Sequence, residues 1–188
     1  MRLRLERWTS PISPLLFVTD QDGILRALDF DDYEERMHRL LGDHYGEYTL
    51  EEAAAPASLK RSLKAYFEGD MDALSAVKVA TGGTPFQREV WSGLRRIPAG
   101  APISYGQLAT NIGRPGASRA VGAANGANPI AIVVPCHRVI GANGTLTGYG
   151  GGLDRKKWLL DHEAQSLARA GVGREGGLLF GRGLKAGV

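Results

Sequence analysis

The chain contains one cysteine among its 188 residues, Cys136, and His137 follows it directly. Both lie in the stretch Pro135-Cys136-His137-Arg138-Val139, after an apolar run that begins at Ile130. Thiolates are the nucleophilic form of cysteine, and an adjacent imidazole can remove the thiol proton or lower the thiol pKa. A lone cysteine at the end of an apolar run is more often a small buried hydrophobic residue. The pair is therefore a candidate activated sulfur whose role depends on its context.

The composition limits the classes of protein to which the chain can belong. Its length is enough for one or two small domains with a hydrophobic core. A single cysteine excludes an internal disulfide and a zinc site built from several cysteines, and we expect neither a metal nor a cofactor. Met1 to Arg7 carry charges where a signal peptide has its apolar core, and no stretch is long enough to span a bilayer. The sequence predicts a cytoplasmic protein without membrane contact.

The charge balance bears on possible partners. Lys and Arg number 23 against 20 Asp and Glu, which gives a net charge of +3. A mildly basic protein is compatible with a polyanionic partner such as nucleic acid. The balance permits such a partner but does not require one.

The first eighty residues have the pattern of a small mixed unit of strands and helices. Two apolar segments, Leu15 to Thr19 and Ile24 to Leu28, flank the turn-forming residues Asp20-Gln21-Asp22-Gly23, which predicts a β-hairpin. Helical patterns follow over Tyr33 to Leu41 and over Leu59 to Phe67. No cluster of catalytic residue types is evident in this half.

Thr81-Gly82-Gly83 marks the predicted start of a second unit. Thr84-Pro85-Phe86-Gln87 combines an N-cap, a proline at the first helical position and a capping-box glutamine, and therefore predicts a helix that ends before Pro98. We interpret this helix as scaffold, with its apolar residues inward and its arginines mainly in solvent. The predicted inward residues are Phe86, Val90, Leu94 and Ile97, and the predicted solvent-facing residues are Arg88, Arg95 and Arg96.

A second capping box, Ser104-Tyr105-Gly106-Gln107, predicts a short helix through Ile112, and another helix is expected over about Ala117 to Ala127. The short Gly-containing turn between them is typical of a helix-turn-helix, and also of an ordinary helix pair. The second helix consists mostly of small residues, with Arg119 and Asn125 as its main long or polar side chains. It suits tight packing against a neighbour, or DNA binding without sequence readout, because side chains able to contact base edges are nearly absent.

Several further motifs lie between about Thr84 and Glu163. They are Ile103-Ser104-Tyr105, Ser118-Arg119-Ala120-Val121-Gly122, Asn128-Pro129, Pro135-Cys136-His137-Arg138-Val139, Tyr149-Gly150-Gly151-Gly152, Lys157-Trp158-Leu159-Leu160 and His162-Glu163. In their order and spacing the chain resembles the O6-alkylguanine-DNA alkyltransferases, or methylated-DNA–protein-cysteine methyltransferases, of the bacterial single-function type. The resemblance implies a DNA repair protein that flips an alkylated base out of the duplex and moves the alkyl group onto Cys136.

The resemblance implies roles for five residues in the transfer. Cys136 would be the nucleophile, and His137 would remove its proton through a water. Glu163 would orient and stabilise the imidazole, and the Tyr105 hydroxyl would donate to the departing guanine. Asn128 would be a hinge whose side chain bonds backbone groups and ties the DNA-binding helix to the strand that carries the cysteine.

The resemblance also implies a surface for double-stranded DNA that carries alkylated bases. Arg119 would fill the hole left by the flipped nucleotide, and Arg114 would contact phosphate. Ser118 and Asn125 are further candidate DNA-binding residues, and the candidate base-pocket residues are Tyr149, Gly150, Gly151 and Val139. Some relatives have a hydroxyl residue where Gly150 stands. We therefore hypothesise a roomier pocket that accepts O4-alkylthymine or bulkier alkyl groups.

A looser resemblance over the amino-terminal residues completes the expected fold. The expected class is α/β (α+β), with residues 1–80 as a ribonuclease H-like sheet-and-helix domain. Residues 81–166 are expected to form a mostly helical DNA-binding and alkyl-transfer domain with a helix-turn-helix of winged-helix type. Residues 167–188, rich in Gly and Arg, are predicted to be a flexible tail, and the protein is expected to be a monomer.

Two rival classes of function fit parts of the sequence. A Cys-His-Glu hydrolase would need an oxyanion hole and an acyl substrate, and no signature of one is present. A helix-turn-helix regulator or a catalytically inactive lesion sensor would bind DNA alone, but family members of the latter kind lack the cysteine. Alkyl transfer yields a thioether, which has no activated carbonyl for water to attack, so the sequence predicts one stoichiometric turnover per molecule.

Overall fold

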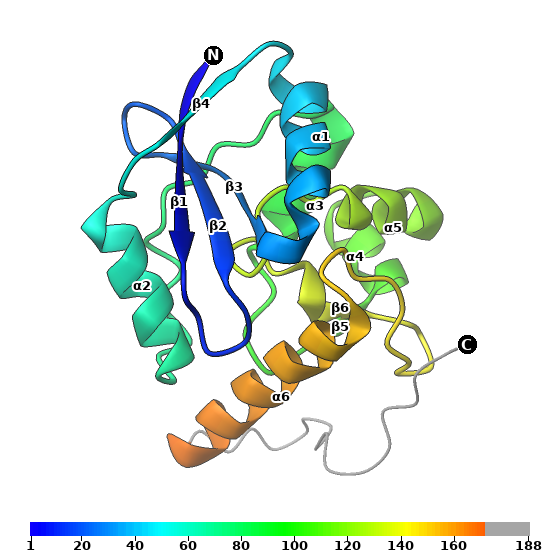
Figure 1. The fold of residues 1–188 in the computed structure, drawn as a ribbon. Coiled ribbons are helices and arrows are strands. Elements are labelled where there is room, and N and C mark those ends of the chain that lie inside the picture. The colour runs from blue at the N-terminus through cyan, green and yellow to red at the C-terminus, as the bar shows by residue number, and fades with distance from the viewer. Residues whose placement is uncertain (172–188) are drawn as a thin grey trace.

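A four-stranded sheet forms the amino-terminal half of the structure, a computed structural model that describes residues 1–171 (Figure 1). Its strands are β1 (Arg2–Trp8), β2 (Leu15–Thr19), β3 (Leu25–Phe30) and β4 (Thr49–Glu52), in the order β3-β2-β1-β4. β2 pairs antiparallel with β1 and β3, whereas β4 pairs parallel with β1. The predicted hairpin is therefore confirmed, and β1 and β4 are additional strands that the sequence analysis did not predict.

Local chemistry explains both the hairpin and the unpredicted strand β1. The Asp20 carboxylate accepts hydrogen bonds from the backbone N–H groups of Asp22 and Ile24, and so holds the turn. In β1, Leu3 and Leu5 are buried and alternate with charged residues, which is the period of two expected for a strand with one face inward. The charged side chains Arg2, Arg4 and Glu6 lie on the other face, where Arg2 is exposed and Arg4 and Glu6 are half-buried.

Helices cover both faces of the sheet. A short 3-10 turn, η1 (Asp31–Tyr33), leads into α1 (Glu34–Tyr45), whose Met37 and Leu41 pack with Leu16 and Val18 on one face. Residues Leu15 and Phe17 alternate with these and face the larger core, which also includes side chains from α2 (Ala57–Phe67). The two helices predicted for this half are confirmed.

The carboxy-terminal half is mostly helical. Its elements are α3 (Pro85–Leu94), β5 (Ile103–Ser104), α4 (Tyr105–Asn111), α5 (Ser118–Gly126), η2 (Cys136–Arg138), β6 (Val139–Ile140) and α6 (Leu153–Arg169). Both predicted capping boxes are present, at Thr84 with Gln87 and at Ser104 with Gln107. β5 and β6 form a two-stranded parallel sheet that brings the segment after the cysteine beside the start of α4.

The side chains of α3 lie largely as predicted. Val90, Leu94 and Ile97 are buried and Phe86 is half-buried. Arg88 and Arg96 are exposed. Arg95 is an exception, because its guanidinium is half-buried and donates to the carbonyl oxygens of Leu74, Ser75 and Val77. It ties α3 to the segment that connects the two halves.

The apolar run before Cys136 joins the two halves. The Leu28 N–H donates to the Pro129 carbonyl at 3.0 Å, and the Ala131 N–H donates to the Leu28 carbonyl at 2.8 Å. The expected strand carrying the cysteine is not formed, because the run folds as a buried sequence of turns with Ile132 at φ 67°. That conformation is strained for a β-branched residue and is held by the surrounding core.

The ends of the described chain bear on two further predictions. α6 extends to Arg169, so the first residues of the predicted tail are helical, and residues 172–188 of that tail lie outside the described structure. Within residues 1–171, no helix is long and apolar enough to cross a membrane.

Candidate active site

Cys136 lies at the start of η2, beneath the junction of the two halves, and is only 5% exposed. Burial raises the pKa of the thiol, whereas the Asn128 amide within hydrogen-bonding reach, and the charges of Arg36 and Lys156, act to lower it. The net effect is an increase. The sulfur is therefore mainly protonated at neutral pH and needs a base to become a nucleophile.

His137, the next residue, is the candidate base. Its Nε2 lies 2.8 Å from Glu163 Oε1, and both side chains have no exposed surface. Burial lowers the pKa of His137 despite the opposing effect of Glu163, so the imidazole is neutral at pH 7. Since the carboxylate accepts a hydrogen bond from Nε2–H, the lone pair is at Nδ1, which has no hydrogen-bond partner among the described residues. A neutral imidazole with a free lone pair can accept the thiol proton.

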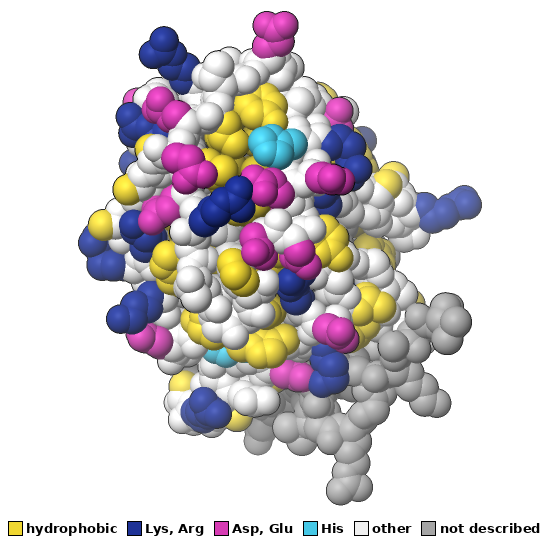
Figure 2. Space-filling model, viewed as in Figure 1, with side chains coloured by type: hydrophobic (Ala, Val, Ile, Leu, Met, Phe, Trp, Pro, Cys, Tyr) yellow, Lys and Arg dark blue, Asp and Glu magenta, His cyan; other side chains and the backbone are white. Residues whose placement is uncertain are grey.

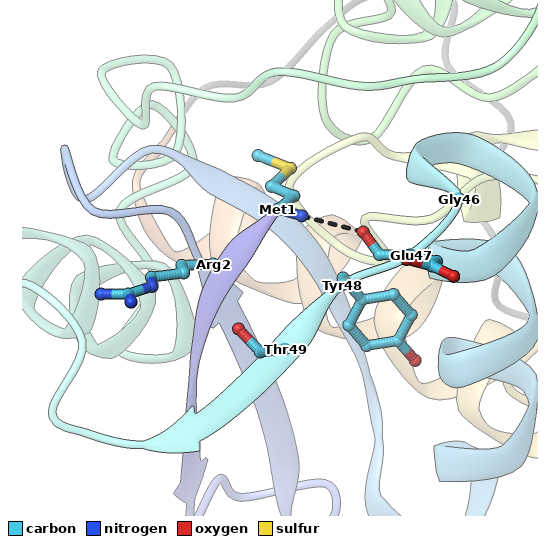
Figure 3. A pocket seen from close by; sticks show the side chains of 6 residues that line it. All are labelled: Met1, Arg2, Gly46, Glu47, Tyr48 and Thr49. Atoms are coloured by element: carbon cyan, nitrogen blue, oxygen red, sulfur yellow. Dashed lines mark hydrogen bonds between the residues drawn. The ribbon is translucent and has the colours of Figure 1, made fainter.

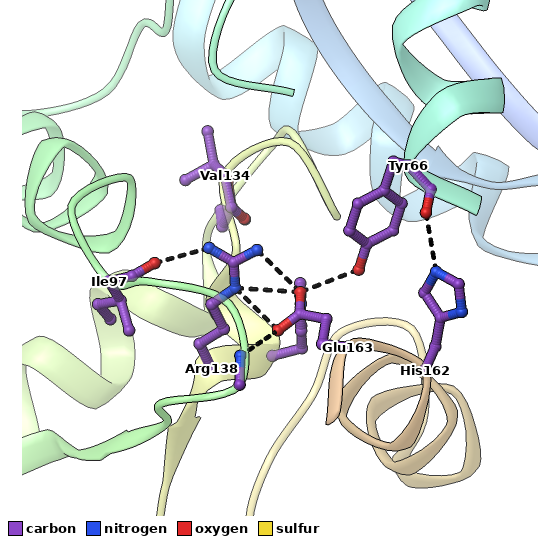
Figure 4. A network of polar contacts seen from close by, with 9 residues as sticks. Tyr66, Ile97, Val134, Arg138, His162 and Glu163 are labelled. Carbon is purple, nitrogen blue, oxygen red and sulfur yellow. Dashed lines mark hydrogen bonds and ion pairs between the residues drawn. The ribbon is translucent and has the colours of Figure 1, made fainter. Parts of the chain in front are cut away.

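Glu163 of α6 is the centre of a buried polar network (Figure 4). Besides His137, it accepts hydrogen bonds from Arg138 at 2.8 to 3.1 Å, from the Tyr66 hydroxyl at 2.9 Å and from the Gly100 N–H at 3.3 Å. Burial favours a higher pKa for Glu163, but His137 and Arg138 outweigh it and lower the pKa to about 2. Because His137 is neutral at pH 7, Arg138 is the charge that balances the carboxylate there.

Asn128 lies between α5 and the cysteine segment and is 1% exposed. Its amide nitrogen donates to the carbonyl oxygens of Val134 at 2.8 Å and Ile130 at 3.3 Å. Its amide oxygen accepts from the Ile130 N–H at 3.0 Å. One side chain thus makes hydrogen bonds to three backbone groups of the run that leads to Cys136, and fixes the position of that run relative to α5.

Tyr105 and Tyr149 lie close enough to Cys136 for its charge to raise their pKa values. Burial is the main cause of the increase for both residues. The Tyr105 hydroxyl, at the start of α4, donates to the Thr147 carbonyl at 3.2 Å. The Tyr149 hydroxyl is buried and has no partner in residues 1–171. Both phenols therefore remain protonated at neutral pH and can donate hydrogen bonds.

Lys156 of α6 fixes the loop that contains the candidate base-pocket residues. Its ammonium group is fully buried and donates to the carbonyl oxygens of Val139 at 2.6 Å, Thr147 at 2.8 Å and Gly148 at 3.4 Å. Burial lowers its pKa to about 8, although the Cys136 charge acts in the opposite direction. The sequence analysis missed Lys156, Tyr66 and Arg138; only Arg138 had a signal, its place in the cysteine motif.

α5 presents the candidate DNA-binding side chains in two directions. Arg119 is exposed and Ser118 is half-buried. Asn125 is only 3% exposed, and its amide donates to the Cys136 carbonyl at 3.4 Å. It does not share the outer face with Arg119, in contrast to the expectation that both reach outward. Arg114, before the helix, is exposed and pairs with Glu89 at 3.3 Å.

Neither the charges on the face shown in Figure 2 nor the hollow shown in Figure 3 extends this site. On the face shown in Figure 2, Lys and Arg side chains are mixed with Asp and Glu, so the positive charge is not concentrated there. A hollow at the start of β1 and β4 contains none of the candidate site residues (Figure 3). Within residues 1–171, no group of three or more His, Cys, Asp or Glu side chains could hold a metal ion. The hollow is lined by Met1, Arg2, Gly46, Glu47, Tyr48 and Thr49.

These contacts define a class of protein in which a buried thiol and a neutral imidazole lie next to a candidate DNA-binding helix. Comparison with known proteins specifies the class further. Residues 85–165 match the family model described as 6-O-methylguanine DNA methyltransferase, DNA binding domain. The chain is 54% identical over 169 residues to the methylated-DNA–protein-cysteine methyltransferase of Salmonella typhimurium, covering 89% of this chain and 99% of the relative. The same-named protein of Methanosarcina acetivorans is 49% identical over 154 residues, with coverages of 82% and 94%.

Solved structures agree with the sequence comparisons. The O6-methylguanine methyltransferase of Mycobacterium tuberculosis superposes with a TM-score of 0.72 at 42% identity, covering 87% of this chain and 94% of that one. The structure of OGT from the same organism in complex with DNA gives a TM-score of 0.72 at 40% identity, with coverages of 88% and 94%. The chain belongs to the methylated-DNA–protein-cysteine methyltransferase family, whose members repair DNA by transferring an alkyl group to a cysteine of the protein.

Proposed function

We propose that Cys136 accepts the alkyl group from O6-alkylguanine in double-stranded DNA, and that each molecule reacts once. The observation that carries this assignment is that the only cysteine of the sequence is buried beside a neutral imidazole oriented by a carboxylate. A protein that transfers alkyl groups to a cysteine needs a thiol with a base close to it. Cys136 is the only thiol in this sequence.

The proposed chemistry is a displacement at the alkyl carbon. The thiol proton passes through a bridging water to His137 Nδ1 as the sulfur forms its bond to carbon. The bond between that carbon and guanine O6 breaks, and its electron pair stays on the base. Tyr105 exchanges its hydrogen bond to the Thr147 carbonyl for one to the departing guanine, which finally gains the proton that the thiol lost. Glu163 stabilises the imidazolium that forms in between.

The proposed DNA contacts follow from the exposed part of α5 and its surroundings. Arg119 enters the duplex and replaces the flipped nucleotide, while Arg114 and Ser118 contact the backbone. The flipped base enters a pocket formed by Tyr149, Gly150, Gly151 and Val139. For Asn125 we propose a supporting role inside the protein, since its side chain faces the Cys136 carbonyl and not the outer surface. O4-alkylthymine is a second candidate substrate.

The finer description of the fold is also proposed. Residues 1–80 are proposed to be a ribonuclease H-like domain, an assignment supported by the order β3-β2-β1-β4 with one parallel pair. Residues 81–166 are proposed to be the DNA-binding and transfer domain of winged-helix type. We further propose a monomer that acts in the cytoplasm.

A titration of protein against lesion tests the proposed function. An oligonucleotide duplex with a radiolabelled methyl group on guanine O6 is added in increasing amounts to a fixed amount of protein. We expect the label on the protein to stop at one methyl per molecule, and C136A to take up none while still binding the duplex. Sustained turnover would exclude a dead-end thioether, and binding without transfer by the native chain would favour a lesion sensor.

A further inference from the structure

Gly150 in the candidate base-pocket loop lies against a side chain from the other half of the protein. A Cβ atom built on Gly150 would lie 2.8 Å from both Cζ and Nη2 of Arg36, and 3.0 Å from its Nε. Real Cβ atoms do not approach other atoms within 3.0 Å. The guanidinium of Arg36, in α1, therefore occupies the space that a side chain at position 150 would fill.

The Arg36 side chain is held in that place by several partners. Its Nη1 donates to Asp29 Oδ2 at 2.5 Å, and Asp29 itself is buried. Its Nη2 donates to the carbonyl oxygens of Gly126, the last residue of α5, at 2.8 Å and of Asn128, two residues later, at 3.0 Å. A guanidinium held by these three acceptors cannot move away without breaking its hydrogen bonds to two carbonyl oxygens and to the Asp29 carboxylate.

We propose that Arg36 is a positioning residue for alkyl transfer, and that it takes the place of the side chain missing at Gly150. This inference rests on the proposed function. Arg36 fixes the end of α5, the Asn128 hinge and the pocket loop in one arrangement, because a single guanidinium contacts all three. Contrary to the hypothesis of a roomier pocket, the glycine does not widen the site at this point, since Arg36 fills the space that it leaves.

The charge of Arg36 adds to this role. Arg36 acts to lower the pKa of Cys136, and Asp29 acts to raise it. Lys156 is the other cation that acts on the thiol. The amino-terminal half thus places a cation and a carboxylate close enough to the sulfur to shift its pKa, in opposite directions.

Reciprocal substitutions test the proposal. G150A adds one methyl group that must displace Arg36, while R36A removes the obstacle. For each variant we propose to measure the single-turnover rate constant at saturating duplex, and the duplex affinity in a C136A background. Controls are G42A, where a Cβ meets nothing within 4 Å, and R39A, which removes an exposed arginine of the same helix.

We expect G150A and R36A each to lower the rate constant about tenfold, and the double variant to be no more than about threefold slower than R36A. R36K keeps the positive charge but lacks the planar guanidinium that bonds several acceptors at once, so its transfer rate constant should also be low. Duplex affinity and the two controls should stay within about twofold of their reference proteins. If R36A does not fold, R36K replaces it in the comparison.

Three results would overturn the proposal. They are a G150A protein as fast as the native one, multiplicative effects of the two substitutions, or full activity of R36K. A native protein that transfers no methyl group at all would instead refute the proposed function, so the two failures are distinguishable.

Discussion

Replacing Glu163 with glutamine (E163Q) tests the buried network most severely. The carboxylate accepts from a tyrosine of α2, from His137 and Arg138 of the cysteine segment, and from the backbone before β5. Glutamine keeps the shape of the side chain but removes its charge and replaces one acceptor oxygen with a donor. Arg138 would then remain buried without its partner.

The magnitude follows from the pKa of the carboxyl group. A decrease from 4.5 to about 2 corresponds to about 3 kcal/mol of folding free energy. Because the pKa is lower in the folded protein, this contribution is complete above about pH 4.5 and is lost as the pH falls toward 2. Removing one partner of a buried ion pair costs about 3–5 kcal/mol. We therefore expect E163Q to be about 3–5 kcal/mol less stable than the native protein at pH 7.

Urea unfolding between pH 7 and pH 3 measures this effect. The native protein should lose stability steeply below about pH 4.5, and E163Q should lack most of that slope. E68Q is the matched control, because Glu68 forms an exposed pair with Lys64 and should change stability by less than about 0.5 kcal/mol. Native-like stability of E163Q at pH 7, or an unchanged acid slope, would refute this account of the network.

Three further predictions concern the reaction and its supports. R119A should slow transfer from duplex DNA at least about tenfold and leave transfer from free O6-benzylguanine unchanged. Equal effects of R119A on both substrates would contradict the role of Arg119. R114A should only reduce the salt dependence of DNA binding, by about one phosphate contact. N128A leaves the buried Ile130 N–H unpaired and removes the hydrogen bonds to the Ile130 and Val134 carbonyl oxygens, so it should lower the free energy of unfolding by about 2 kcal/mol, as urea titration would measure. The transfer rate should be constant from about pH 6.5 to 7.5, below the pKa of about 8 of Lys156, and should fall at lower pH as His137 becomes protonated. A tenfold rise per pH unit across that window in stopped-flow assays would indicate a thiolate formed without His137.

Local signals in the sequence predicted the helices well. The two capping boxes each place a hydroxyl residue three positions before a glutamine, so the start of α3 and α4 could be read without tertiary information. The hairpin had a comparable signal in its Asp and Gly turn. β1 was missed because its charged residues suggested an exposed end, although they alternate with Leu3 and Leu5.

The features that the sequence could not reveal depend on distant contacts. Tyr66 is 97 residues from Glu163, and Arg36 is 92 residues from Asn128. No local pattern predicts such pairs. Asn125 was assigned to the wrong face because a helix of small residues has too little hydrophobic contrast to show which side is buried. The run from Ile130 is apolar throughout, so its length and composition alone could not distinguish a strand from the buried turns that Asn128 holds.

The central claim, that one sulfur atom of this chain is permanently alkylated by damaged DNA, is tested most directly by mass spectrometry. The protein is incubated with an excess of duplex containing O6-methylguanine, and intact and proteolysed masses are recorded. We predict one added CH2 per molecule, located on the peptide that contains Cys136. An unchanged mass, or a methyl group on any other residue, would contradict the assignment.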